Sequence, residues 1–312
     1  MTTTPLVSIV IPTRNGGATL PSVFEALSRQ QVDFEFEVVA IDSGSTDGSL
    51  DLLQRRADRV VEVDAAEFDH GLTRNLGIEH ARGELIVLLV QDAVPANEKW
   101  LRELTAPLLS DTAVAGTFAR QRPRSDASAI TRYYHERWVA AADAQRTMAI
   151  DRFASFEALE PMQRFLLCAF DNVCSCIRRT VWQSHPFRST PIAEDLEWAR
   201  DVLLAGYRLV YAPRAVVVHS HDRSARYELA RTYALHHRLY ELFSVRTIPS
   251  VGGLWRAIAT SAALHLKCQR HESARPRAIG RAVALAVAWP VGQYLGGLSA
   301  ARGWKPIRSR TV

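Results

Sequence analysis

The chain has 312 residues, of which 47% are hydrophobic and 23% charged, and this composition is typical of a soluble globular protein. Its length allows one large domain or two modest ones. The four cysteines form no CxxC pair and no secretory framework, so we expect reduced thiols and a cytoplasmic location. We also expect no signal peptide, because Val7–Pro12 is too short an apolar run and no basic residue precedes it.

The net charge of +5 is divided unevenly along the chain. Residues 223–312 hold 15 lysines and arginines but only three acidic residues, a balance of +12 that leaves −7 for the first 222 residues. Such asymmetry predicts that the C-terminal region faces an anionic partner. Nucleic acid, a membrane surface and a pyrophosphate-bearing substrate all satisfy this charge. Nucleic acid is disfavoured because the region has no recognisable binding motif.

Short apolar runs alternate with segments of helical periodicity in the first part of the chain. Strands are predicted at Val7–Ile11, Glu37–Asp42, Arg59–Val63, Leu85–Val90 and Val114–Phe118. Helices are predicted at Leu20–Leu27, Leu50–Ala57, Thr73–Ala81 and Trp100–Leu108. This alternation predicts an α/β fold with a mostly parallel central sheet flanked by helices. We expect Pro12 to end the first strand.

The alternation is lost at residues 125–165, which we interpret as a mostly helical insertion. Beyond it, the sequence predicts a strand at Val173–Ile177 and a helix that begins near Pro191. Two short strands are predicted to follow, at Leu209–Tyr211 and Ala215–Val218. The chain from Tyr227 onward is predicted to be helical and basic. We therefore divide the protein into an α/β domain over residues 1–226 and a basic helical region over residues 227–312.

Residues Ala282–Ala301 are uncharged for long enough to span a bilayer. Pro290 and three glycines dilute the hydrophobicity of this segment, and Gly292-x-x-x-Gly296 is only a short match to a membrane packing motif. A helix that packs on the protein or lies in the lipid interface is therefore favoured over one that crosses the membrane.

Polar clusters follow the predicted strands, at Pro12-Thr13, Asp42-Ser43, Gln91-Asp92 and His219-Ser220-His221. In open α/β sheets, ligands bind outside the carboxyl ends of the strands. A carboxylate fixed there, such as that of Asp92, can hold a hard cation, and the cation can hold a phosphate. The plain alternative is that Asp92 only caps the turn before the next proline.

The order and spacing of these segments resemble the family 2 inverting glycosyltransferases of the GT-A fold, and within them the bacterial rhamnosyltransferases. The matching segments are VSIVIPTRNGG, IDSGSTDGS, FDHGLTRNLGIEHARGE, QDAVP, GTFARQRPR, AEDLEWARDVLLAGY and VVVHSHD. They lie between residues 6 and 226, and the rest of the chain resembles the family only weakly. The resemblance implies a nucleotide-sugar-binding domain over residues 1–226, with the insertion on the acceptor side.

The resemblance also implies which residues bind the nucleotide-sugar donor. The carboxylate of Asp42 is expected to accept a hydrogen bond from the pyrimidine N3–H, and Arg74 is expected to present its fork of donors to the diphosphate. Further donor-binding residues implied by the family pattern are Pro12, Thr13, Asn15, Asn75, Gln91, Asp92 and Glu194. Without the resemblance, Asp42 is a turn residue and Arg74 a solvated charge at a helix start.

Asp92 is the implied ligand of a divalent metal ion that bridges the diphosphate. Family members often carry two or three acids here as D-x-D, whereas this chain has Gln91-Asp92-Ala93. A histidine after the last strand is expected to complete the site, with His219 favoured and His221 second. This mixture of oxygen and nitrogen ligands suits Mn²⁺ at least as well as Mg²⁺. A satisfied surface histidine is the alternative.

Asp195 is the implied general base, with Glu194 as its neighbour. Inverting sugar transfer needs one base on the face opposite the leaving diphosphate, where it takes the proton of the acceptor hydroxyl. We expect the helix dipole to keep this carboxylate ionised. The alternative is that both acids serve only the electrostatics of a helix start.

The expected function is metal-dependent transfer of L-rhamnose from dTDP-β-L-rhamnose to a glycan or lipid-linked glycan in polysaccharide biosynthesis of the cell envelope. The basic C-terminal region is expected to contact the inner face of the membrane. A non-catalytic nucleotide-sugar-binding or scaffold protein is the alternative, whereas a dinucleotide-dependent oxidoreductase is disfavoured because no GxGxxG follows the first strand. Three aromatic residues of the insertion, Tyr133, Tyr134 and Trp138, are expected to form its core rather than to stack on acceptor sugars.

Overall fold

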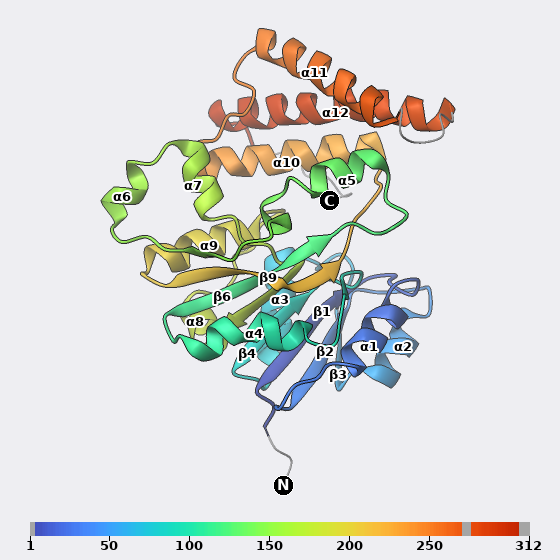
Figure 1. The fold of residues 1–312 in the computed structure, drawn as a ribbon, viewed down its shortest axis with the longest axis vertical. Coiled ribbons are helices and arrows are strands. Elements are labelled where there is room, and N and C mark those ends of the chain that lie inside the picture. Colours follow the sequence, from blue (N-terminus) through green and yellow to red (C-terminus); the bar gives the residue numbers. More distant parts are fainter. Residues whose placement is uncertain (1–3, 270–275, 306–312) are drawn as a thin grey trace.

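The computed structural model describes residues 4–269 and 276–305 (Figure 1). The strands in this part of the chain are β1 (Val7–Thr13), β2 (Phe36–Asp42), β3 (Arg59–Glu62), β4 (Leu85–Leu89), β5 (Val94–Pro95), β6 (Val114–Arg122), β7 (Arg146–Met148), β8 (Cys174–Arg178) and β9 (Arg208–Val218). They form a single sheet in the order β3-β2-β1-β4-β8-β6-β9-β5, with β7 paired to β9.

Helices cover the sheet and extend beyond it (Figure 1). Those of the first half are α1 (Leu20–Ser28), α2 (Ser49–Arg56), α3 (His70–His80) and α4 (Trp100–Ser110). The middle of the chain contributes α5 (Ala129–His135), the 3₁₀ turn η1 (Val139–Ala141), α6 (Phe153–Glu157), α7 (Pro161–Leu167), α8 (Arg179–Ser184) and α9 (Glu194–Leu204). The chain then forms the long helices α10 (Ala225–Phe243), α11 (Val251–Gln269) and α12 (Pro276–Ala301).

The predicted α/β class is confirmed, and the sheet is mixed. Strands β3, β2, β1 and β4 are mutually parallel, as are β6 and β9. Between these two groups, β8 pairs antiparallel with both β4 and β6. Side chains of β1 alternate between two cores, with Val10 in one and Ile9 and Ile11 in the other. A strand buried on both faces therefore reads as a continuous apolar run.

Two predicted strand boundaries are wrong. Strand β1 does not end at Pro12, because Pro12 still pairs with Ile41 of β2 and lies beyond the pairing with β4, which ends at Val10. The two predicted short strands around Pro213 are one strand, β9. The pairing with β6 shifts register between Ala119 and Arg120, so the extra residues at Pro213 bulge out without ending the strand.

Residues 125–165, predicted as a mostly helical insertion, contain short helices together with β7, which joins the edge of the sheet through β9. Helix α3 begins at His70, three residues before the predicted start, because the Asp69 side chain caps it. Its Oδ1 accepts hydrogen bonds from the backbone N–H groups of Gly71 and Leu72, both at 2.9 Å.

Helix α12 packs closely on α10, and its glycines make this approach feasible. A Cβ added at Gly292 would lie 2.9 Å from the Leu229 carbonyl oxygen, and one at Gly296 would collide with the carbonyl oxygen of Tyr233. The GxxxG pattern thus serves helix packing within the protein in this structure. Among the described helices, one segment, Ile279–Ala301, is long and apolar enough to cross a membrane, and half of its most apolar window is buried inside the protein.

Candidate active site

One carboxylate and two imidazoles converge where β4 and β9 end. Asp92 lies between β4 and β5, and antiparallel pairing of Val94 with Val218 brings it beside the segment that follows β9. The His221 Nε2 atom lies 3.1 Å from Asp92 Oδ2, and His219 Nε2 lies 3.7 Å from Asp92 Oδ1. One ligand atom from each residue lies within 4.8 Å of the other two. We call Asp92, His219 and His221 the histidine cluster.

A buried amide orients the histidine cluster. The Nδ1 atom of His219 lies 3.2 Å from Gln121 Oε1, while Gln121 Nε2 donates to Asp171 Oδ2 at 2.6 Å. With Nδ1–H donated to the amide, the lone pair of His219 Nε2 points into the cluster, where His221 Nε2 lies 3.1 Å away. Such outer hydrogen bonds are typical of histidines that bind metal ions.

The protonation state of the cluster also suits a metal ion. Burial lowers the pKa of His219 to about 4 and also lowers the pKa of His221. Both imidazoles are therefore neutral at pH 7, which is the form that binds metals. The second histidine supplies a donor in place of the carboxylate that the D-x-D pattern would have offered, so the residues fit a divalent cation such as Mn²⁺.

The predicted base lies at the first turn of α9. Its N-cap, Ala193, adopts the left-handed conformation with φ of 64°, and the acidic residues Glu194 and Asp195 follow it. Asp195 Oδ1 accepts a hydrogen bond from the Leu196 backbone N–H at 2.8 Å, and Oδ2 accepts from the Asn172 backbone N–H at 3.3 Å.

The expected effect of the helix dipole on Asp195 is outweighed by its surroundings. Burial raises the pKa of Asp195 well above its usual value, and the neighbouring carboxylates of Glu194 and Asp171 raise it further. Both effects disfavour the charged form more than the helix start favours it. Asp195 is therefore a stronger proton acceptor than an ordinary aspartate.

Asp171 and Asn172, which we call the connecting segment, join the two centres. Asp171 holds Gln121, which orients the histidine cluster, and it also accepts a hydrogen bond from Trp138 Nε1 at 3.0 Å. The next residue, Asn172, holds Asp195 through its backbone. The sequence analysis missed Gln121 and both residues of the connecting segment. The sequence feature that could have identified Asp171 and Asn172 is that they form a polar pair directly before the predicted strand at Val173.

Arg74 forms a buried ion pair at the same end of the sheet. Its Nη1 atom lies 3.0 Å from Glu194 Oε1, and both side chains are only 7% exposed. The same nitrogen donates to the carbonyl oxygen of His70 at 2.8 Å. Burial lowers the pKa of the His70 imidazole, which faces both charges. Arg74 is therefore not a solvated charge at a helix start, and His70 is a further residue that sequence reasoning missed.

Loops at the ends of β1 and β2 are tied to each other. Asp42 is 1% exposed, and its Oδ2 accepts a hydrogen bond from the Ser45 backbone N–H at 2.9 Å. No described residue hydrogen-bonds to its buried Oδ1. Thr13 lies opposite Asp42 in the β1–β2 pairing, and Asn15 Oδ1 accepts from the Thr46 backbone N–H at 2.8 Å. A carboxylate oxygen without a hydrogen-bond partner among the described residues thus lies beside the loops where the pyrimidine of the donor is expected.

Two predicted donor-binding residues, Gln91 and Asn75, form hydrogen bonds to other segments of the protein in this structure. The side-chain amide of Gln91 bonds both the N–H and the carbonyl group of Arg14, at 2.8 and 3.0 Å, and so fixes the loop after β1. Asn75 Oδ1 accepts from Trp182 Nε1 and the Phe187 backbone N–H, while Asn75 Nδ2 donates to the Phe187 carbonyl oxygen. The amide of Asn75 therefore ties α3 to α8 and to the segment before α9.

Two of the three aromatic residues expected in the core of the insertion do not lie there. Tyr134 and Trp138 are both exposed by more than a third of their surface. The Tyr134 ring packs edge-on against Trp289 of α12, with ring centres 4.6 Å apart. A groove of about 520 Å³ beside Met148 and Leu166 shares no residue with either centre.

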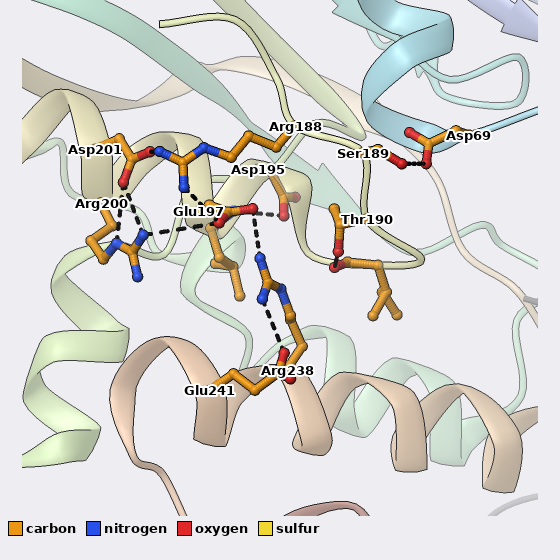
Figure 2. Close-up of polar contacts among 12 residues, drawn as sticks. Asp69, Arg188, Ser189, Thr190, Asp195, Glu197, Arg200, Asp201, Arg238 and Glu241 are labelled. Atoms are coloured by element: carbon orange, nitrogen blue, oxygen red, sulfur yellow. Dashed lines mark hydrogen bonds and ion pairs between the residues drawn. The ribbon is translucent and has the colours of Figure 1, made fainter. Parts of the chain in front are cut away.

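Charged residues connect α9 to α10, as Figure 2 shows. The buried carboxylate of Glu197 contacts Arg188 at 3.2 Å and Arg238 of α10 at 2.6 Å. The segment before α9 is held at its other side, where Ser189 Oγ donates to Asp69 Oδ2 at 2.8 Å. The helix that carries Asp195 is thus fixed by ionic and hydrogen-bonded contacts on both sides.

Comparisons with known proteins agree with this arrangement. Residues 8–185 match the model of the family "Glycosyl transferase family 2". The O-antigen chain rhamnosyltransferase RfbN of Salmonella typhimurium is 30% identical over 231 residues, which cover 73% of this chain and 70% of that protein. The O-antigen chain rhamnosyltransferase WbaN of Salmonella anatum is 26% identical over 239 residues, with 73% and 70% covered.

Solved structures share the fold. Glucosyl-3-phosphoglycerate synthase from Mycobacterium tuberculosis, in complex with Mn²⁺, UDP and glucosyl-3-phosphoglycerate, matches 80% of this chain and 82% of its own, with a TM-score of 0.54 and 20% identity. Residues 1–349 of S. aureus TarS, in complex with UDP-GlcNAc, match 96% of this chain and 92% of that one, with a TM-score of 0.53 and 16% identity. The family model matches more than half of the chain, so the protein belongs to glycosyl transferase family 2 and is a glycosyltransferase of the GT-A fold.

Proposed function

We propose that the protein transfers L-rhamnose from dTDP-β-L-rhamnose to a glycan or lipid-linked glycan, by an inverting displacement that depends on a divalent metal ion. The observation that carries this proposal is the connecting segment, since it joins the histidine cluster to Asp195 within one hydrogen-bonded frame. A metal-held leaving group and a base on one rigid frame are what a single displacement requires.

The donor is held at three points in this proposal. Asp42 Oδ1 accepts the pyrimidine N3–H, which a buried acceptor without a partner would favour. Pro12, Thr13 and Asn15 line the nucleoside beside it. The histidine cluster binds Mn²⁺ or Mg²⁺, and a cation bound there neutralises charge on the leaving diphosphate.

Glu194 and Arg74 act together near the diphosphate. Their buried ion pair keeps the guanidinium in place, and its Nε carries no hydrogen bond to any described residue. The remaining donors of Arg74 can therefore address phosphate oxygens without breaking the pair. Gln91 and Asn75 position the donor site indirectly, because their amides hold the loop after β1 and the segment before α9.

Asp195 is the general base of the proposed reaction. The acceptor hydroxyl oxygen attacks C1 of the sugar on the face opposite the diphosphate. As the new C1–O bond forms, the bond from C1 to the phosphate oxygen breaks and its electron pair leaves with the nucleoside diphosphate. The hydroxyl proton passes to the Asp195 carboxylate, whose raised pKa favours its capture.

The rhamnosyl donor and glycan acceptor are supported by the relatives from Salmonella, both of which are named as O-antigen chain rhamnosyltransferases. The proposal includes a cytoplasmic location at the inner face of a membrane. A place in polysaccharide biosynthesis of the cell envelope follows from the same relatives.

A donor screen tests this proposal directly. The purified full-length chain is incubated with a panel of nucleotide sugars, and released nucleoside diphosphate is measured with Mn²⁺, with Mg²⁺ and with a chelator. We expect release from dTDP-β-L-rhamnose that the chelator abolishes. Release that persists unchanged with the chelator would contradict the metal site, and turnover of a different donor alone would contradict the rhamnosyl assignment.

A further inference from the structure

The outermost helices expose an unusual share of apolar surface. Sixteen large apolar side chains are exposed in the described part of the chain, and eight of them lie between residues 251 and 304. These eight are Val251, Trp255, Leu266, Ile279, Val283, Val287, Leu295 and Trp304. Residues scattered singly need no explanation, but concentration in two helices marks an interaction surface.

On α12, three of the exposed apolar residues lie on one face. Ile279, Val283 and Val287 follow one another at intervals of four residues, so they form a stripe along the helix. The stripe extends over eight helical residues, or about 12 Å. The opposite face packs on α10, where His237 Nδ1 lies 2.7 Å from Ser299 Oγ in a buried contact.

Helix α11 adds tryptophan to this surface. Trp255 is 67% exposed, and Val251 lies one turn before it on the same face. Figure 1 shows α11 and α12 as the outer part of the helical layer, on the side of α10 away from the sheet. Near the end of this layer, the Arg302 guanidinium lies 5.0 Å from the centre of the Trp304 ring. Tryptophan beside a cation is typical of a membrane–water interface.

The charge of this surface has one sign. Glu272 is the single acidic residue in the sequence after Glu241, and none occurs in the described parts of α11 and α12. Four basic side chains in this part of the chain are exposed, namely those of Arg256, Lys267, Arg302 and Lys305. A partner for this surface should therefore provide both an apolar region that accepts these side chains and negative charge.

We propose that α11 and α12 form a docking surface that lies flat on an anionic lipid bilayer. A second copy of the chain fits less well, because a two-fold dimer would bring together two copies of the same positively charged surface. A membrane-crossing α12 also fits less well, since its inner face is committed to α10. The inference rests on the proposed function in one respect, since a lipid-linked acceptor would give this surface its purpose.

Vesicle flotation tests the docking surface without any turnover. The full-length chain is mixed with vesicles of phosphatidylcholine alone or with a third of phosphatidylglycerol. We expect binding to the anionic vesicles that is at least about tenfold stronger and that weakens as salt is raised. Equal binding to both vesicles, or binding to neither, would overturn the proposal.

A matched pair of triple variants locates the surface. Trp255→Gln/Val283→Gln/Val287→Gln leaves the charge unchanged and is expected to weaken binding at least about tenfold. Leu109→Gln/Phe153→Gln/Met162→Gln changes three exposed apolar residues elsewhere and is expected to leave it unchanged. Thermal unfolding verifies that both variants fold. Equal weakening in both, or none in the first, would overturn the assignment.

Two further readouts separate the possible failures. Light scattering without vesicles is expected to show the same molecular mass for the wild type and the first variant, whereas a dimer that this variant dissociates would assign the surface to a second copy and overturn the proposal. Donor turnover with a water-soluble acceptor is expected to be the same in both triple variants. Absence of vesicle binding by the wild-type chain, with its turnover intact, would refute the docking surface alone, because the proposed function would still stand.

Discussion

The two chemical centres of this protein are built in opposite ways. The histidine cluster stands on strand ends, and its side chains are kept neutral by burial and oriented by an amide. The proposed base stands at a helix start next to a left-handed residue, and its carboxylate lies near those of Glu194 and Asp171. In our proposal the first centre accepts a cation, whereas the second accepts a proton. The connecting segment joins the two centres, and the Asp171 carboxylate raises the pKa of both His219 and Asp195.

Removal of the proposed base should have the largest effect. Asp195→Asn keeps the size of the side chain but removes its ability to take a proton, so we expect the rate of sugar transfer to fall by roughly 10²- to 10⁴-fold. Donor affinity, measured by calorimetry, should remain near that of the wild type. Asp201→Asn, on the same helix but paired with Arg188 and Arg200, is the control and should retain most activity. A normal transfer rate in Asp195→Asn would exclude Asp195 as the base.

Loss of the Gln121 amide, which orients the histidine cluster, should have the second-largest effect. Gln121→Leu removes the hydrogen bonds to both His219 and Asp171, and loss of such an outer contact typically costs about 10- to 100-fold in metal affinity. We expect a higher Mn²⁺ concentration for half-maximal activity, with recovery at saturating Mn²⁺. Gln163→Leu, at the start of α7, serves as the control. An unchanged Mn²⁺ requirement would show that Gln121 does not orient the cluster.

The sequence predicted the residues at the strand ends better than the contacts that support them, for a physical reason. Apolar runs locate strand ends, so Asp42, Asp92 and His219 could be identified without a partner in view. Gln121 and Asp171 become neighbours only because β8 inserts antiparallel between β4 and β6, and periodicity does not encode which strands pair. The pKa of Asp195 was likewise misjudged, because the helix dipole is a local property whereas burial and the approach of Asp171 are tertiary.

The pH dependence should distinguish the two centres further. The raised pKa of Asp195 means that activity should be lost as the pH falls through that value, since the protonated carboxyl cannot act as a base. Glu194→Gln removes a neighbouring negative charge, so the pKa of Asp195 should fall and the acid limb of the rate profile should move to lower pH. The measurement is the rate of transfer against pH at saturating metal. Movement of the limb to higher pH, or none, would argue that Glu194 does not act on the base.

The smallest expected effect concerns the backbone before the base. Ala193 has φ of 64°, which costs a residue with a Cβ about 1 kcal/mol, whereas glycine adopts it without strain but loses more entropy on folding. Ala193→Gly should therefore change the free energy of unfolding by less than about 1 kcal/mol. Ala205→Gly, at the other end of the same helix with φ of −77°, relieves no strain and should be the more destabilising of the two in denaturant titrations. If Ala193→Gly destabilises as much as Ala205→Gly, the left-handed residue is not strained. The inward direction of Glu194 and Asp195 would then follow from the buried Arg74 ion pair, and the base would depend on the same tertiary contacts that raise its pKa.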